Sequence, residues 1–154
     1  KLVIAPHVID ENHLVEIIRK LKRPYVRYTR ADEKNVRKAD CLIIDCFGLL
    51  SSIYRYGEIA YIGGGFGVGI HNTLEAAVYG IPVIFGPKYQ KFQEAIQLLE
   101  AKGAFSVKDY EELKTLLDRM LTDEVFLRES GMNASNYVTG NAGATDKIMS
   151  MINF

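Results

Sequence analysis

The sequence has no tryptophan, two cysteines among 154 residues, and no apolar run as long as the roughly 20 residues that a membrane-spanning helix needs. It also has no recognisable signal peptide. Cys41 and Cys46 stand at the two ends of an apolar segment. On a strand they would point to opposite faces, so we do not expect a disulfide between them. Two small buried side chains in a reducing compartment are the simpler interpretation.

Net charge is absent too, because 19 Lys and Arg residues balance 19 Asp and Glu residues. A balance of this kind gives no support for nucleic acid as a general partner. The three histidines, His7, His13 and His71, have no ligand cluster around them, so we expect no metal ion and no cofactor. The length and the 48% hydrophobic content are ordinary for one soluble domain with a real core.

Short apolar runs alternate with segments of helical periodicity along the whole chain. Strands are predicted at 2–5, 25–28, 41–45, 59–62, 81–85 and 104–107. Helices are predicted at about 11–21, 49–56, 73–79, 92–101, 110–121, 124–138 and 144–152, with a short one within 29–40. The alternation predicts βαβ units, and near-continuous apolar strands predict a parallel sheet covered on both faces. We therefore expect a single α/β domain over 1–154, built on one doubly wound, Rossmann-like sheet.

In such a sheet, ligands bind at the carboxyl ends of the strands. The richest candidate is 63–75, where five glycines in seven residues precede a helix. Glycines let the backbone approach a ligand closely, and a helix start offers N–H groups to an anion. The segment fits the dinucleotide fingerprint poorly and is no Walker A loop. A flexible turn between strand and helix is the alternative.

Two interpretations stay open for Asn72 and Glu75. Spaced three residues apart at a helix start, they match a capping box. Equally, Glu75 could accept hydrogen bonds from a ribose while Asn72 or backbone N–H groups hold a phosphate. His71 is placed to donate to that phosphate.

Other candidates follow the first, third and fifth strands. The candidate after the first strand is His7. Phe47 and Gly48 form either one wall of a base pocket or the start of a packed helix. Lys88 and Lys91 lie after the fifth strand, where they are either solvated or neutralise ligand charge. Asp45 suits a buried capping role better than catalysis.

Segment 60–87 contains A-Y-I-G-G-G, then H-N-T-L-E-A-A, then G-I-P-V-I-F-G-P. It resembles bacterial 3-deoxy-D-manno-octulosonic acid (Kdo) transferases, whose pattern is F-V-G-G-S, G-G-H-N-P-L-E-P-A and G-x-P-V-L-F-G-P. Gly48-Leu49-Leu50 and the segment 54–60 are similar to the family's G-E-L-x-x-x-Y-x-x-A-D. The chain departs from the pattern in having Gly65 for serine, Thr73 for proline and His7 for arginine.

The resemblance implies the carboxyl-terminal, donor-binding half of a GT-B type glycosyltransferase. Such an enzyme transfers Kdo from CMP-Kdo to a lipid A precursor in lipopolysaccharide biosynthesis, without a metal. The catalytic glutamate and the acceptor site would lie in an amino-terminal domain, at the cytoplasmic face of the inner membrane. This chain alone is then soluble and inactive, with no catalytic residue of its own. The donor-binding residues implied are His7, Phe47, Gly48, Gly63, Gly64, Gly65, His71, Asn72, Glu75 and Lys91.

Two alternatives remain at this point. One is the donor-binding domain of another GT-B enzyme that uses a UDP-sugar. The other is a stand-alone nucleotide-binding module.

Overall fold

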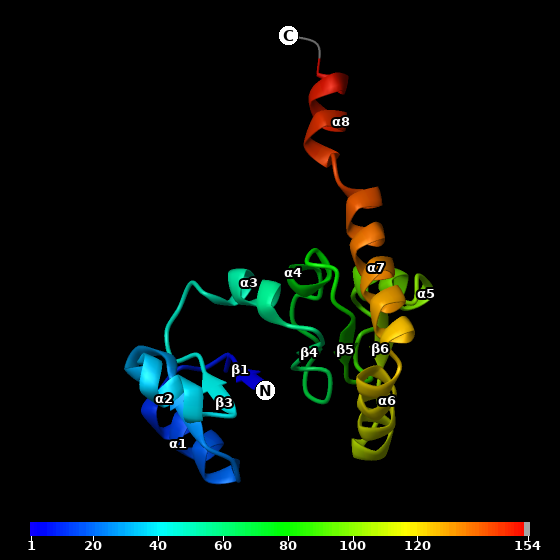
Figure 1. Ribbon diagram of the computed structural model, residues 1–154. Helices are drawn as coiled ribbons and strands as arrows, with labels where there is room; N and C mark the ends of the chain where they lie inside the picture. Colours follow the sequence, from blue (N-terminus) through cyan, green and yellow to red (C-terminus); the bar gives the residue numbers. More distant parts are fainter. Residues whose placement is uncertain (153–154) are drawn as a thin grey trace. The chain divides into compact units, whose positions relative to one another are not determined.

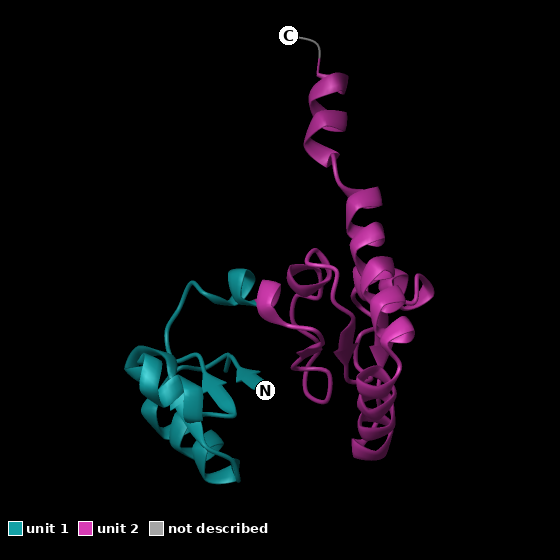
Figure 2. Cartoon of the chain, viewed as in Figure 1, with its two compact units in different colours: residues 1–53 teal, residues 54–154 magenta. Residues whose placement is uncertain are grey.

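The computed structural model describes residues 1–152, and its contacts divide the chain into two compact units, Lys1–Ile53 and Tyr54–Phe154 (Figure 2). Both units are α/β, and every strand pairing in them is parallel. The parallel α/β architecture expected from the sequence is confirmed.

The first unit holds a three-stranded sheet in the order β1-β3-β2 (Figure 1). Leu14 on a helix packs against Cys41 and Ile43 on the central strand, and all three are at most 2% exposed. Both cysteines are free thiols, and burial raises the pKa of the Cys41 thiol. The elements of this unit are β1 (Leu2–Ile4), α1 (Glu11–Lys20), β2 (Tyr25–Arg27), the 3-10 helix η1 (Tyr28–Arg30), α2 (Glu33–Lys38), β3 (Cys41–Ile43) and α3 (Leu50–Ile53).

The second unit holds the sheet β4-β5-β6. Its central strand, β5, is wholly buried: Val83 and Phe85 enter one core cluster, and Ile84 between them enters another. This alternation shows that both faces of the sheet are covered. The elements are the 3-10 helix η2 (Tyr54–Tyr56), β4 (Ala60–Ile62), α4 (Leu74–Ala77), β5 (Val83–Phe85), α5 (Gln93–Glu100), β6 (Ala104–Ser106), α6 (Tyr110–Thr122), α7 (Glu124–Asn141) and α8 (Ala144–Met151).

Helix ends follow the sequence signals closely. Asp10, Asp109 and Asp123 each accept a hydrogen bond at 2.9 Å from the backbone N–H three residues on, as N-caps do. Gly80 ends the helical turn that follows α4. Its φ is +71°, a backbone conformation that residues other than glycine rarely adopt. No helix within residues 1–152 combines the length and the apolar character needed to cross a bilayer.

The continuity of the sheet differs from the expectation. The six strands form two three-stranded sheets instead of one. Within the first sheet, β3 pairs with β1 on one edge and with β2 on the other. The interpretation of 1–154 as one domain stays a prediction, and its last two residues lie outside the described part.

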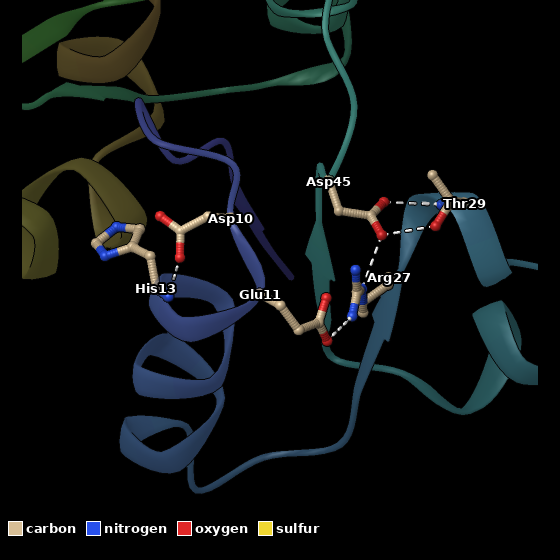
Figure 3. Close-up of polar contacts among 6 residues, drawn as sticks. All are labelled: Asp10, Glu11, His13, Arg27, Thr29 and Asp45. Carbon is tan, nitrogen blue, oxygen red and sulfur yellow. Dashed lines mark hydrogen bonds and ion pairs between the residues drawn. The ribbon is translucent and has the colours of Figure 1, made fainter.

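A network of charges ties the first unit together at Asp45, just after β3 (Figure 3). One carboxylate oxygen accepts from Arg27 Nε at 2.7 Å and from the Thr29 hydroxyl at 2.6 Å, and the other accepts from the Thr29 backbone N–H at 2.9 Å. Arg27 also pairs with Glu11 at 2.6 Å. β2 and η1 therefore meet at one carboxylate whose side chain is 1% exposed, and α1 is joined to them through the Glu11–Arg27 ion pair.

The same contacts account for the ionisation of these groups. Burial alone would raise the pKa of Asp45, but the hydrogen bonds from Thr29 and Arg27 outweigh it and lower the pKa to about 2. The bonds to Glu11 and Asp45 raise the pKa of Arg27. Asp45 is buried, as expected, but it forms an ion pair with Arg27 and hydrogen bonds with Thr29 where a helix-capping role was expected.

Asp45→Asn should destabilise the first unit by about 2–3 kcal/mol, because hydrogen bonds to a buried charge are lost. Urea unfolding followed through amide NMR signals of residues 1–53 measures this. Asp40→Asn, at an exposed position, is the control and should change stability by less than about 0.5 kcal/mol. Since the pKa of Asp45 lies at about 2, below the usual 3.8, its contribution is present above about pH 4 and disappears as the pH falls toward 2. An equal loss in both variants would contradict the network's role.

Candidate nucleotide-binding site

Three predicted site residues meet at the carboxyl edge of the first sheet. His7 follows β1, Phe47 and Gly48 follow β3, and together they line a pocket of about 300 Å³. Phe47 is 81% exposed, and Gly48 makes the turn with a φ of +86°. The other lining residues are mostly apolar: Ala5, Pro6, Ile9, Ile44, Cys46 and Leu50. An exposed aromatic ring beside an apolar hollow is a suitable wall for a planar base.

The glycine loop, residues 63–71, follows β4 in the second unit and is closed by its own backbone. The His71 N–H donates to the Gly63 carbonyl at 3.2 Å. Within the loop, the Gly64 carbonyl accepts from the N–H groups of Gly67 at 2.8 Å and Gly69 at 3.3 Å. Gly64 and Gly69 have φ values of +88° and +152°. These φ values favour glycine, which accounts for glycine at both positions. The alternative of a flexible turn between strand and helix stays open.

Gly65 and Gly86 bring the ends of β4 and β5 into direct backbone contact. A Cβ atom on Gly65 would lie 2.6 Å from the Gly86 nitrogen, and one on Gly86 would lie 2.7 Å from the Gly65 carbonyl carbon. No side chain fits at either position without displacing backbone. The departure from the family's serine at Gly65 therefore matches a local packing constraint of this chain.

Asn72 and Glu75 are bonded to each other, but not as a complete capping box. Asn72 Oδ1 accepts from the Leu74 N–H at 3.0 Å, and Asn72 Nδ2 donates to Glu75 Oε1 at 3.0 Å. In a capping box the glutamate would accept from the backbone N–H of the cap residue instead. The geometry accommodates both interpretations, a local cap and a ribose acceptor.

Tyr54 lies close enough to Glu75 for the two to interact electrostatically. Burial, followed by the charge of Glu75, raises the pKa of the Tyr54 phenol, which keeps that hydroxyl protonated. Tyr54 was not among the predicted site residues, although the segment 54–60 that begins with it is part of the family resemblance.

The segment after β5 contributes lysines at the same edge. Lys91 is exposed, as expected for a residue that could meet ligand charge. Lys88, which the sequence grouped with it as one of two rim cations, contacts the glycine loop directly: its ammonium donates to the Gly67 carbonyl at 2.7 Å. The sequence could not predict this contact, because a long lysine side chain can reach many partners and nothing in the sequence identifies Gly67 as the one it bonds to.

The ten predicted residues thus form two groups, one in each unit. His7, Phe47 and Gly48 lie together in the first; Gly63, Gly64, Gly65, His71, Asn72 and Glu75 lie together in the second, with Lys91 after the neighbouring strand. Their role in binding stays a prediction.

Two further features bear on the chemistry. A hollow of about 760 Å³ lies beside β6 and α6, and none of the predicted residues line it. No group of three or more His, Cys, Asp or Glu side chains within residues 1–152 is arranged to hold a metal ion.

No protein-family model matches the sequence. The 3-deoxy-D-manno-octulosonic acid transferase of Aquifex aeolicus is 37% identical over 124 residues, which is 79% of this chain and 34% of that protein. The enzyme of the same name from Rickettsia bellii is 32% identical over 73% of this chain and 28% of its own length. This chain is a homologue of the Kdo transferases. It spans about a third of the length of those relatives.

Two other comparisons extend this family resemblance. A bifunctional glycosyltransferase/methyltransferase of Fusobacterium nucleatum is 30% identical over 89% of this chain and 23% of its own length. Among solved structures, the carboxyl-terminal CMP-Kdo binding domain of WaaA from Acinetobacter baumannii has a TM-score of 0.75 at 18% identity. That match covers 88% of this chain and 72% of the other, and at this identity it shows that the two chains share a fold.

Thr73, which replaces the family's proline, has a buried hydroxyl. The residue is 1% exposed, and its Oγ1 atom has no hydrogen-bond partner among the described residues. A buried polar group without a partner costs about 1–3 kcal/mol.

Thr73→Val should therefore raise the free energy of unfolding by about 1 kcal/mol, since it replaces the hydroxyl by a methyl group of similar size. Chemical denaturation of the two proteins measures the change. Thr115→Val, at an exposed position on α6, serves as the matched control and should be within about 0.5 kcal/mol of the parent. A loss of stability in Thr73→Val would show that the hydroxyl is satisfied in solution.

Proposed function

We propose that this chain is the donor-binding part of an enzyme that transfers Kdo from CMP-Kdo to a lipid A precursor at the cytoplasmic face of the inner membrane. The observation that carries the proposal is the closed glycine loop followed by H-N-T-L-E, at the carboxyl edge of a parallel sheet, in a homologue of the Kdo transferases.

The loop's hydrogen bonds orient its peptide groups. In a trans peptide the N–H points opposite to the C=O of the preceding residue. The carbonyls of Gly65 and Gly67 both point to Lys88, to its backbone N–H at 2.9 Å and to its ammonium at 2.7 Å. The N–H groups of Phe66 and Val68 consequently point away from Lys88. Backbone N–H groups in glycine turns of this kind bind anions, and the phosphate of CMP is an anion.

The remaining parts of the donor would be held by the groups around the loop. Glu75 would accept hydrogen bonds from the ribose hydroxyls. His71 and Lys91 would add positive or donor groups near the phosphate. Such groups favour the charge that accumulates as CMP departs, so no metal is required.

By resemblance, an acceptor hydroxyl would displace CMP directly, with inversion at the anomeric carbon. The base that takes its proton would lie outside this chain. Asp45, the candidate at the end of the third strand, is held by Arg27 and Thr29 and so does not fit that role.

A nucleotide titration tests the proposal. CMP should bind this chain more tightly than UMP, GMP or AMP, and should shift the amide NMR signals of Gly64, Gly65, His71 and Asn72 most. Stronger binding of UMP would support the alternative of a UDP-sugar enzyme. Equal binding of all four, or no shift in the loop, would contradict the proposal.

Glu75→Ala should weaken CMP binding by about 1–3 kcal/mol, because a hydrogen bond to a charged group is lost. Glu75→Gln is the matched variant: its amide oxygen can still accept from Asn72 while the charge is removed. If Glu75 serves only the helix start, both variants should bind CMP normally in the folded fraction, and Glu75→Ala alone should lose about 1 kcal/mol of stability. Calorimetric binding and thermal melting on the same samples separate the two roles.

A further inference from the structure

Lys88 makes two hydrogen bonds to the glycine loop from the neighbouring strand end. Its backbone N–H donates to the Gly65 carbonyl at 2.9 Å, and its ammonium donates to the Gly67 carbonyl at 2.7 Å. Both acceptors lie on the loop that follows β4, whereas Lys88 lies three residues after the end of β5. One residue therefore connects the two strand ends at the candidate site.

The side-chain contact adds a hydrogen bond from outside the loop to the loop's exposed tip. The Gly65–Gly86 contact holds the loop's first half, and the His71 N–H to Gly63 carbonyl bond closes its base. Between them lies the tip, Phe66 to Val68, which is exposed; Val68 is 103% exposed. At the tip, the Gly67 N–H donates to Gly64 and the Gly67 carbonyl accepts the Lys88 ammonium.

We propose that Lys88 is a positioning residue: it holds the tip of the glycine loop in the conformation that presents the Phe66 and Val68 N–H groups to the ligand phosphate, and does not itself touch that phosphate. Charge-assisted hydrogen bonds of this kind are stronger than neutral ones, so a single side chain can set the population of one loop conformation. The proposal rests on the donor-binding function proposed above.

The chemistry distinguishes this role from that of an ordinary phosphate-binding lysine. A lysine in contact with phosphate contributes Coulomb attraction, which salt screens. A lysine that orients the loop acts through the fraction of molecules with the loop in the competent conformation, and this fraction scales the apparent affinity without changing its salt dependence.

The test compares Lys88→Met, Lys88→Arg and the parent chain, with Lys114→Met on α6 as a control for the loss of one positive charge. Lys88→Met keeps the backbone bond to Gly65 and removes only the ammonium. In the ligand-free chain, amide hydrogen exchange at Gly67 and Gly69 should accelerate in Lys88→Met, with unchanged exchange in the cores. CMP should bind about three- to tenfold more weakly, and Lys88→Arg, which can still donate to the Gly67 carbonyl, should restore both properties.

The ratio of CMP affinities at low and high salt completes the test. For Lys88→Met it should equal that of the parent chain. A reduced salt dependence with unchanged exchange in the loop would overturn the proposal and make Lys88 a phosphate ligand, as would weak binding that arginine fails to rescue. Unchanged exchange and unchanged affinity would likewise overturn it. If the parent chain binds no CMP, the donor-binding function fails, while accelerated exchange in Lys88→Met would still support the loop-holding role.

Discussion

The backbone contact between Gly65 and Gly86 is the constraint on which the candidate site depends. Because neither residue has a side chain, the ends of β4 and β5 meet directly, and a Cβ at either position would collide with backbone atoms. The contact places the segment after β5 beside the segment after β4. Lys88 can then reach the loop carbonyls, and the loop in turn leads into the Asn72–Glu75 pair at the start of α4. Gly64 is constrained in a similar way within the loop, because a Cβ there would lie 2.2 Å from the Gly69 carbonyl oxygen.

The first unit depends on a different kind of interaction. Its sheet is small, and three of its elements are joined through Asp45 and Arg27. A buried ion pair gives little net stability compared with apolar packing, but removing one partner leaves the other charge uncompensated. The arrangement therefore specifies which segments meet, and it occupies the only carboxylate that directly follows β3. This explains why an acidic residue at the carboxyl end of a strand, normally a candidate for catalysis, is unavailable for it here.

Signals carried by neighbouring residues predicted helix ends and the glycine loop well. They did not predict which strands pair, or which distant side chains form contacts. Asp10, Asp109 and Gly80 marked helix ends correctly, because a cap involves only neighbouring residues. The glycine loop was recognised, because its residues are contiguous. The separation into two sheets was missed, since apolar runs do not say which strand edges are already paired. The partnership of Arg27 with Asp45 and the contact of Lys88 with Gly67 were missed for the same reason: long side chains reach partners that sequence spacing does not identify.

The two interpretations of Glu75, helix cap and ribose acceptor, are physically compatible. One carboxylate oxygen bonds to Asn72, which itself holds the first turn of α4 through the Leu74 N–H. That bond restricts the rotamers of Glu75 before any ligand arrives. Ordering a flexible glutamate on binding would otherwise cost about 0.5–1.5 kcal/mol, so a carboxylate held at one oxygen binds more favourably through the other. In such a site the local structural role lowers the entropic cost of the binding role, and the same residues would serve both.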